Sequence, residues 1–166
     1  MAARLRSGAL LAVASIAAVT TSAHGFVPWT SPAGNGSFFS YSGGGSDNGL
    51  FGDPTLISGH AFQFSPTAFT TTSTNGVETS LTDRLEVTLT ADAGHHFTSI
   101  RIMESGGWSI AGVGFVSDSG AMTLTDLVNL RAPVADSLDT NPLMPIVTAD
   151  ASGTWNSSAF IDLTQI

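Results

Sequence analysis

The stretch from Arg84 to Glu104 constrains the fold more than any other part of the chain. Apolar and polar side chains alternate over residues 85–89, and the same alternation returns over residues 99–103 after a polar interval. A period of two is typical of a β-strand with one face buried and the other in water. Two such runs joined by a short polar loop predict an antiparallel hairpin, in which Leu85 lies opposite Ile102.

Short runs of β-favouring residues, separated by Gly, Pro, Asn and Asp, recur along the rest of the chain, and a helical period of 3.6 is almost absent. We expect the strand after the hairpin loop to end at Ser105–Gly107, where two glycines follow one another. A lone hairpin is only marginally stable in water, so its apolar face needs a second sheet. The sequence therefore predicts a single-domain, all-β, antiparallel β-sandwich of jelly-roll type over residues 37–166.

The N-terminus has the pattern of a secretory signal peptide. Two arginines precede an apolar run from Ala9 to Val19, and small residues lead up to Ala23. We expect residues 1–23 to be removed and an irregular, proline-containing segment over residues 24–36 to precede the domain. No later stretch is long and apolar enough for a membrane span, so the mature protein is expected to be exported, to the medium or the cell surface.

Acidic residues dominate the charge of the chain, which has 13 Asp and Glu against five Arg and no Lys, a formal net charge of −8. Nucleic acid and anionic lipid are poor partners for such a surface, whereas cations and neutral polysaccharides remain open. The chain also has no cysteine, so the domain depends on its core rather than on disulfides. The absence of thiols, of a GK[ST] phosphate loop and of a nucleophile elbow argues against the corresponding classes of enzyme.

Asp83 and Glu104 mark the open end of the predicted hairpin, where they would lie opposite each other. Two opposed carboxylates repel unless a cation lies between them or one takes up a proton. One interpretation is a calcium ion held by both residues. The second is that the strands have diverged and that each acid accepts hydrogen bonds from backbone N–H groups. A glycosidase acid–base pair is a third interpretation, which requires an aromatic-lined cleft between the two carboxyls.

The aromatic residues Trp29, Trp108 and Trp155, together with Tyr41, are candidates for a carbohydrate-stacking platform. The alternative is that these tryptophans belong to the core of the domain, since large aromatic side chains bury much apolar area. Sequence alone leaves both interpretations open.

Cleavage after Ala23 would place His24 at the mature N-terminus, where its amino group and imidazole together can chelate copper. The opening His-Gly-Phe-Val resembles the start of mature copper-dependent lytic polysaccharide monooxygenases, which are exported β-sandwiches. The resemblance covers only this tetrapeptide. The second copper histidine of that family would have to be His60, His95 or His96. His95 and His96, beside the hairpin turn, are otherwise expected to be solvated loop residues.

Four phrases carry a second resemblance: SDNGLFGDPT (46–55), TDRLEVTLTADAG (82–94), FTSIRIMESGGWSI (97–110) and IDLT (161–164). They resemble exported proteins of planctomycete-like marine bacteria that end in a PEP-CTERM sorting tail handled by exosortase. The resemblance implies a surface or matrix protein and assigns no catalytic residue. The sorting tail does not follow Ile166, so we expect either that it is missing from this sequence or that the protein is released.

Taken together, these patterns predict an exported, non-catalytic β-sandwich of the cell surface or extracellular matrix. A carbohydrate-binding module is the alternative function. A copper-dependent polysaccharide monooxygenase that uses His24 is a further alternative, and calcium is the one other cofactor that the sequence suggests.

Overall fold

The computed structural model describes residues 9–15, 25–73 and 77–164, and within these ranges the chain is all-β, with no helix. The predicted fold class is confirmed. The strands are β1 (Ala9–Ser15), β2 (Val27–Pro28), β3 (Gly34–Asn35), β4 (Phe39–Ser46), β5 (Thr55–Ile57), β6 (Ala61–Gln63), β7 (Arg84–Ala91), β8 (Ser99–Val116), β9 (Ala121–Asp126), β10 (Val134–Ser137), β11 (Asp139–Asn141) and β12 (Ile146–Asp162).

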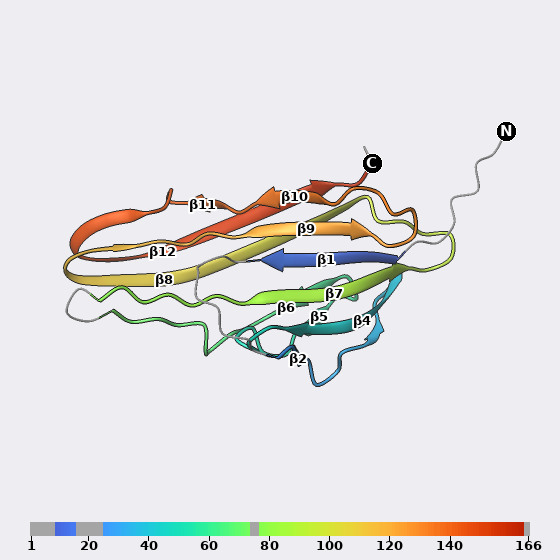
Figure 1. Ribbon diagram of the computed structural model, residues 1–166, viewed down its shortest axis with the longest axis horizontal. Helices are drawn as coiled ribbons and strands as arrows, with labels where there is room; N and C mark the ends of the chain where they lie inside the picture. Colours follow the sequence, from blue (N-terminus) through green and yellow to red (C-terminus); the bar gives the residue numbers. More distant parts are fainter. Residues whose placement is uncertain (1–8, 16–24, 74–76, 165–166) are drawn as a thin grey trace.

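The strands form three antiparallel sheets that pack as a sandwich (Figure 1). The largest has the strand order β10-β9-β1-β7-β4-β2, with β3 also on β4, and a three-stranded sheet has the order β11-β12-β8. A small hairpin of β5 and β6 completes the set. The jelly-roll strand order stays a prediction.

The predicted hairpin between β7 and β8 is wrong in its pairing. β7 pairs with β4 on one side and β1 on the other, whereas β8 pairs with β12 along nearly its whole length. The reason is length: β8 has 18 residues and finds a matching partner in β12, which has 17, while β7 has eight. The loop between β7 and β8 therefore carries the chain from one sheet to the other.

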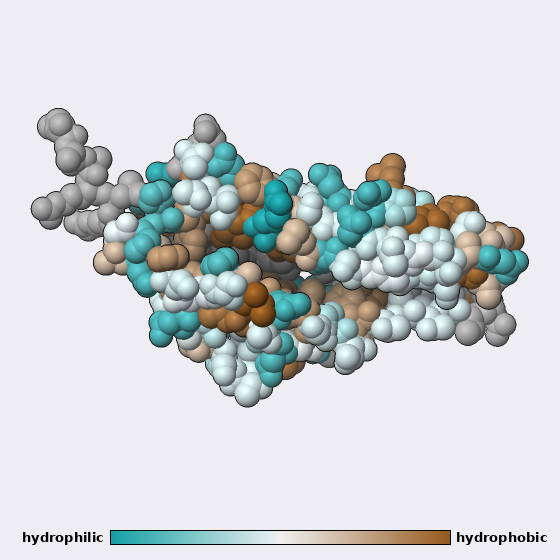
Figure 2. Space-filling view, turned by 180° about the vertical axis from the view of Figure 1, so that it is seen from behind, coloured by the Kyte–Doolittle hydropathy of each residue, from teal (hydrophilic) through white to brown (hydrophobic). Residues whose placement is uncertain are grey.

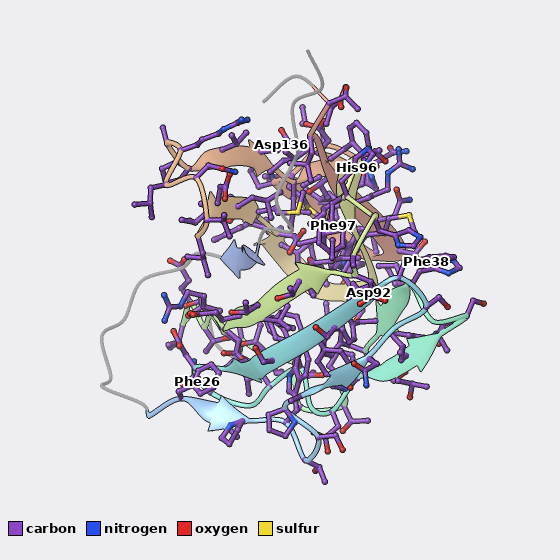
Figure 3. The ribbon with its side chains drawn as sticks, turned by 90° about the vertical axis from the view of Figure 1, so that its right-hand side faces the viewer. Phe26, Phe38, Asp92, His96, Phe97 and Asp136 are labelled. Atoms are coloured by element: carbon purple, nitrogen blue, oxygen red, sulfur yellow. The ribbon has the colours of Figure 1, made fainter. Side chains whose placement is uncertain are left out.

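The expected two-layer packing is nevertheless present. One core cluster is built around Trp29, Phe39, Val87 and Leu89, and the other around Met122, Leu124, Ala159 and Ile161. Ile100 of β8 packs against both clusters, so it joins the two layers. In the end-on view of Figure 3, Phe97 lies between the layers, whereas Phe38, Asp92 and His96 lie at the end of the molecule.

The long ribbon of β8 and β12 folds back on itself. Gly112 and Asp150 both have positive φ, and the register shifts at Asp150, where the carboxylate accepts a 2.7 Å hydrogen bond from the N–H of Gly112. Both strands curl at the left-hand end of Figure 1. The bend brings Asp118 within 3.4 Å of Ser157, although in a straight ladder they would lie roughly 45 Å apart.

Ala9–Ser15, which the sequence analysis assigns to the signal peptide, forms β1 in the fold of the whole chain. Its backbone lies between β7 and β9 in the middle of the largest sheet. The rest of the predicted leader, including the cleavage site after Ala23, lies outside the described residues, and processing stays a prediction. Within the segment predicted to be irregular, residues 24–36, β2 and β3 are two residues long each.

Candidate functional site

An aromatic pocket lies beside β4, under the hairpin of β5 and β6. Its volume is about 190 Å³. The ring of Trp29 lies 5.5 Å from that of Phe62 and 6.3 Å from that of Tyr41, centroid to centroid. The pocket is lined by Trp29, Thr30, Ser31, Tyr41, Asp53, Pro54, Leu56 and Phe62.

A glycine on β4 positions the indole of Trp29. A Cβ atom at Gly44 would lie 2.1 Å from Cε3 of the indole, so only glycine allows the ring to lie this close to the strand. The backbone N–H of Trp29 also donates to the carbonyl of Gly44, at 3.0 Å. The opposite edge of the ring carries Nε1, which is buried and has no hydrogen-bond partner in the described part of the protein. A buried donor without an acceptor is costly, so the packing around this edge of Trp29 must compensate for it.

The rim of the pocket carries a fixed negative charge. The carboxylate of Asp53 accepts hydrogen bonds from the backbone N–H of Thr30, at 2.6 Å, and from its hydroxyl. The side-chain bond, and then the backbone bond, lower the pKa of Asp53 below its ordinary value. Asp53 therefore stays ionised at neutral pH, where it can accept hydrogen bonds but is a weak proton acceptor.

The three tryptophans predicted as a platform do not come together. Trp29 is 4% exposed and belongs to the core cluster beside β4, as the core interpretation predicted. Trp108 and Trp155 are half-buried on the ribbon of β8 and β12, where they lie opposite Gly153 and Gly106 respectively. A Cβ at Gly106 would lie 2.7 Å from the ring of Trp155, and one at Gly153 would lie 2.9 Å from that of Trp108.

The Nε1 atom of Trp108 is also buried without a partner, but its surroundings differ from those of Trp29. The edge of Trp108 that carries Nε1 is the one that lies against Gly153, so the neighbouring strand covers the donor. In Trp29 the edge against Gly44 is the one remote from Nε1. Trp29 lines the pocket with its ring, while its Nε1 is buried and has no surface open to the pocket.

The predicted pairing of Asp83 with Glu104 is wrong, because β7 and β8 belong to different sheets. Asp83 is 2% exposed, and its carboxylate accepts from the backbone N–H groups of Asn48 and Leu50, each at 2.8 Å, and of Arg84, at 2.9 Å. The interpretation of Asp83 as a cap for backbone N–H groups is thus correct. Calcium binding stays a prediction, without these two residues as joint ligands.

Glu104 instead lies near Asp118, a pair that sequence reasoning missed. Burial, and then the negative charge of Asp118, raise the pKa of Glu104 to about 7. Burial also raises the pKa of Asp118, although that carboxylate accepts from the hydroxyls of Ser157, at 3.4 Å, and Thr140, at 3.5 Å. The alternation in the sequence places Glu104 on the inward face of its strand. It does not reveal the bend that brings Asp118 close to Glu104.

The candidate copper ligands remain scattered or undescribed. His24 lies outside the described residues, so its role in copper binding stays a prediction. His60 follows β5 in the turn to β6, and its N–H donates to Ile57. His95 stacks on the exposed ring of Phe38, with centroids 4.9 Å apart, as a loop residue would. In the described ranges, no group of three or more His, Asp or Glu is placed to hold a metal ion.

Comparisons with known proteins leave the family open. No protein-family model matches the chain, no curated protein matches it, and no solved structure matches its fold. Within the described residues, no helix is long and apolar enough to span a membrane.

Proposed function

We propose that this protein is an exported, non-catalytic β-sandwich of the cell surface or extracellular matrix, and that it acts by binding. The observation that carries the proposal is the chemistry of the pocket at Trp29. It combines an aromatic floor with an ionised carboxylate, Asp53, whose pKa is lowered rather than raised. Such groups hold a ligand well, whereas Asp53 lacks the pKa near the working pH that a general acid or base in this pocket would need.

The surface supports a role in association. Hydrophobic side chains gather near the right-hand end of Figure 2, where the ribbon of β8 and β12 turns back. Val113 and Val147 are 89% and 72% exposed there, and Phe115, which is directly opposite Val147 in the ladder, is 57% exposed. Exposed apolar patches of this kind are typical of interaction surfaces. The resemblance to PEP-CTERM proteins agrees with such a location.

Two measurements test this proposal. An epitope-tagged chain expressed in a bacterial host that exports it should appear in the surface or medium fraction and not in the cytoplasm. The purified protein should turn over no polysaccharide or ester. Retention in the cytoplasm would contradict export, and reproducible turnover would contradict the non-catalytic role.

Carbohydrate binding is the second candidate, and the pocket is the observation that favours it. Sugar hydroxyls donate hydrogen bonds, so they can pair with the carboxylate of Asp53 on the rim of the pocket. The apolar face of a sugar ring packs well on aromatic side chains such as Tyr41.

Affinity electrophoresis through gels that contain different glycans tests this candidate. We expect at least one glycan to retard the protein, and Asp53→Asn to weaken the retardation by about tenfold, the effect of losing one charged hydrogen bond. Trp29→Phe, which makes the aromatic lining of the pocket smaller, should act in the same direction. Trp155→Phe, outside the pocket, is the matched control. Equal retardation of Asp53→Asn and wild type would place binding elsewhere, and no retardation of wild type would dispose of this candidate.

A further inference from the structure

The middle of the largest sheet depends on a strand that the exported protein is expected to lose. All seven residues of β1 pair with β7, and six of them also pair with β9. Ala12 lies between Val87 on one side and Leu124 on the other. β1 is antiparallel to both neighbours, so β7 and β9 run parallel to each other and have no direct contact as a ladder.

Removal of β1 would leave a slot one strand wide. Neighbouring strands lie roughly 5 Å apart, so β7 and β9 would face each other across roughly 10 Å. The N–H and C=O groups of both strands that point into the slot would lose their partners, and buried backbone groups rarely remain unpaired. Direct closure would need a new parallel pair between β7 and β9.

Closure would also disturb the core, because each wall of the slot is anchored in a different cluster. Val87 is 4% exposed and packs with Trp29 and Phe39, whereas Leu124 is 2% exposed and packs with Ile161. Moving one wall by a full strand spacing would pull its cluster out of register with the opposing layer. Close-packed interiors resist such shifts.

The walls define the chemistry of a strand that fits. On one face the slot is flanked by apolar residues of both strands, namely the partly buried Leu85 and the buried Val87, Leu89, Met122 and Leu124. On the other face it is flanked by threonines, by Ala121, by Glu86 and by Arg84, whose guanidinium already pairs with Asp47 and Glu86. The occupant must therefore be extended, antiparallel to both walls, apolar at alternate positions and free of negative charge.

A second mature copy is poorly suited to supply this strand. The described strands of seven or more residues that such a copy retains are β4, β7, β8 and β12, and each is already paired within its own sheet. Donating one of them would require the donor to open its own core. The occupant is better supplied by a different protein with a free extended segment, in the manner of strand addition to an incomplete sheet.

We propose that the slot between β7 and β9 of the exported protein is a strand-acceptor site for an extended, uncharged segment of a different protein. In the precursor, Ala9–Ser15 fills the site. The proposal rests on the proposed export with cleavage after Ala23. Before cleavage the leader completes the sheet, and after cleavage the site is open to a partner.

Two chains and two peptides provide the test. The chains are the full chain and the chain that begins at His24. The probe is a synthetic peptide with the sequence of residues 8–16, and its control is the same peptide with Ala12→Pro, which removes a central N–H and cannot continue the ladder. Binding is measured by calorimetry, and amide hydrogen exchange reports on β7 and β9.

We expect the peptide to bind the chain that begins at His24 with 1:1 stoichiometry and to slow amide exchange in β7 and β9 by about tenfold or more. The proline peptide should do neither. The full chain should bind the peptide only when its own strand is disabled by Ala12→Pro, a change that should also lower its Tm. If the shortened chain does not fold alone, the peptide should restore folding.

Three results would overturn the proposal. The first is a shortened chain in which the amides of β7 and β9 are already protected from exchange and which does not bind the peptide. The slot would then have closed directly. The second is an unchanged Tm of the full chain with Ala12→Pro. The third is a shortened chain that forms a dimer with protected β7 and β9, because a second copy would then be the occupant. N-terminal sequencing of the exported protein separates a failure of cleavage from a failure of the slot.

Discussion

Replacing Glu104 by glutamine should stabilise the protein at neutral and alkaline pH. Burial, together with the negative charge of Asp118, raises the pKa of Glu104 from an ordinary 4.5 to about 7. The folded state therefore binds more protons than the unfolded state between these two pKa values. Stability is fully present below pH 4.5 and is lost as the pH rises through about 7. The whole shift corresponds to about 3 kcal/mol.

Urea unfolding measured from pH 4 to pH 8 checks this prediction. The free energy of unfolding of the wild type should fall across this range, and Glu104→Gln should remove most of the fall, because glutamine has the same shape and no charge. At pH 8 the variant should be more stable by about 3 kcal/mol, or roughly 6–12 °C in Tm. Glu78→Gln, at an exposed glutamate outside the strands, is the control and should change little.

The result that would refute the reasoning is a Glu104→Gln variant that is no more stable than wild type at pH 8, or one that keeps the full pH dependence. Either outcome would mean that the carboxyl of Glu104 is hydrated in the folded protein. The bend of the ribbon that places Asp118 beside it would then be in doubt as well.

Three further changes, with Gly107→Ala as a control for one of them, test the packing of the fold by urea unfolding. Asp83→Ala should cost about 2–4 kcal/mol, because three backbone N–H groups around a nearly buried carboxylate lose their acceptor, and added calcium should not restore the loss. Gly106→Ala should cost about 1–3 kcal/mol, because the new methyl would lie 2.7 Å from the ring of Trp155. Gly107→Ala, whose nearest neighbour is 3.7 Å away, should be tolerated, and equal losses at the two glycines would contradict the packing. Gly112→Ala should cost about 1–2 kcal/mol through its φ of 76° alone, since no atom lies within 4 Å of the added carbon, and an unchanged variant would argue against the bend.

The alternation of apolar residues predicted the inward faces of β7 and β8 correctly, but not their partners. Val87 and Leu89 are buried, and Ile100 packs against the same cluster. A period of two indicates which face of a strand is apolar, and it carries no information about which strand lies alongside. Pairing with β12 keeps the apolar side chains of β8 on the inward face, and pairing with β4 and β1 does the same for β7. The alternation alone therefore could not choose among these partners.

The Glu104–Asp118 pair shows the limit of local patterns most clearly. Glu104 lies at an inward-facing position of β8, as the alternation indicates, whereas Asp118 follows the end of the same strand. The two meet only because β8 and β12 turn back together at Gly112 and Asp150. Asp tolerates positive φ better than most residues do, and glycine adopts it freely. Neither residue by itself predicts that two long strands bend at the same point.

Two glycines are also the reason that the sequence did not predict the full length of β8. Glycines lie against the tryptophan rings both beside β4 and on the ribbon of β8 and β12. Two successive glycines read as the end of a strand, because glycine weakens strands and packs nothing of its own. In the structure Gly106 stays in the ladder because the ring of Trp155 covers it from the neighbouring strand. Gly44 also lies against an indole, that of Trp29, but at the point where the register of β4 with β7 shifts. At Gly44, Gly106 and Gly153 an indole thus lies across the backbone of a strand. Gly44 contacts the edge of Trp29 remote from Nε1, whereas Gly153 contacts the edge of Trp108 that carries Nε1. Binding is proposed at Trp29 because its ring lines a pocket beside the ionised carboxylate of Asp53.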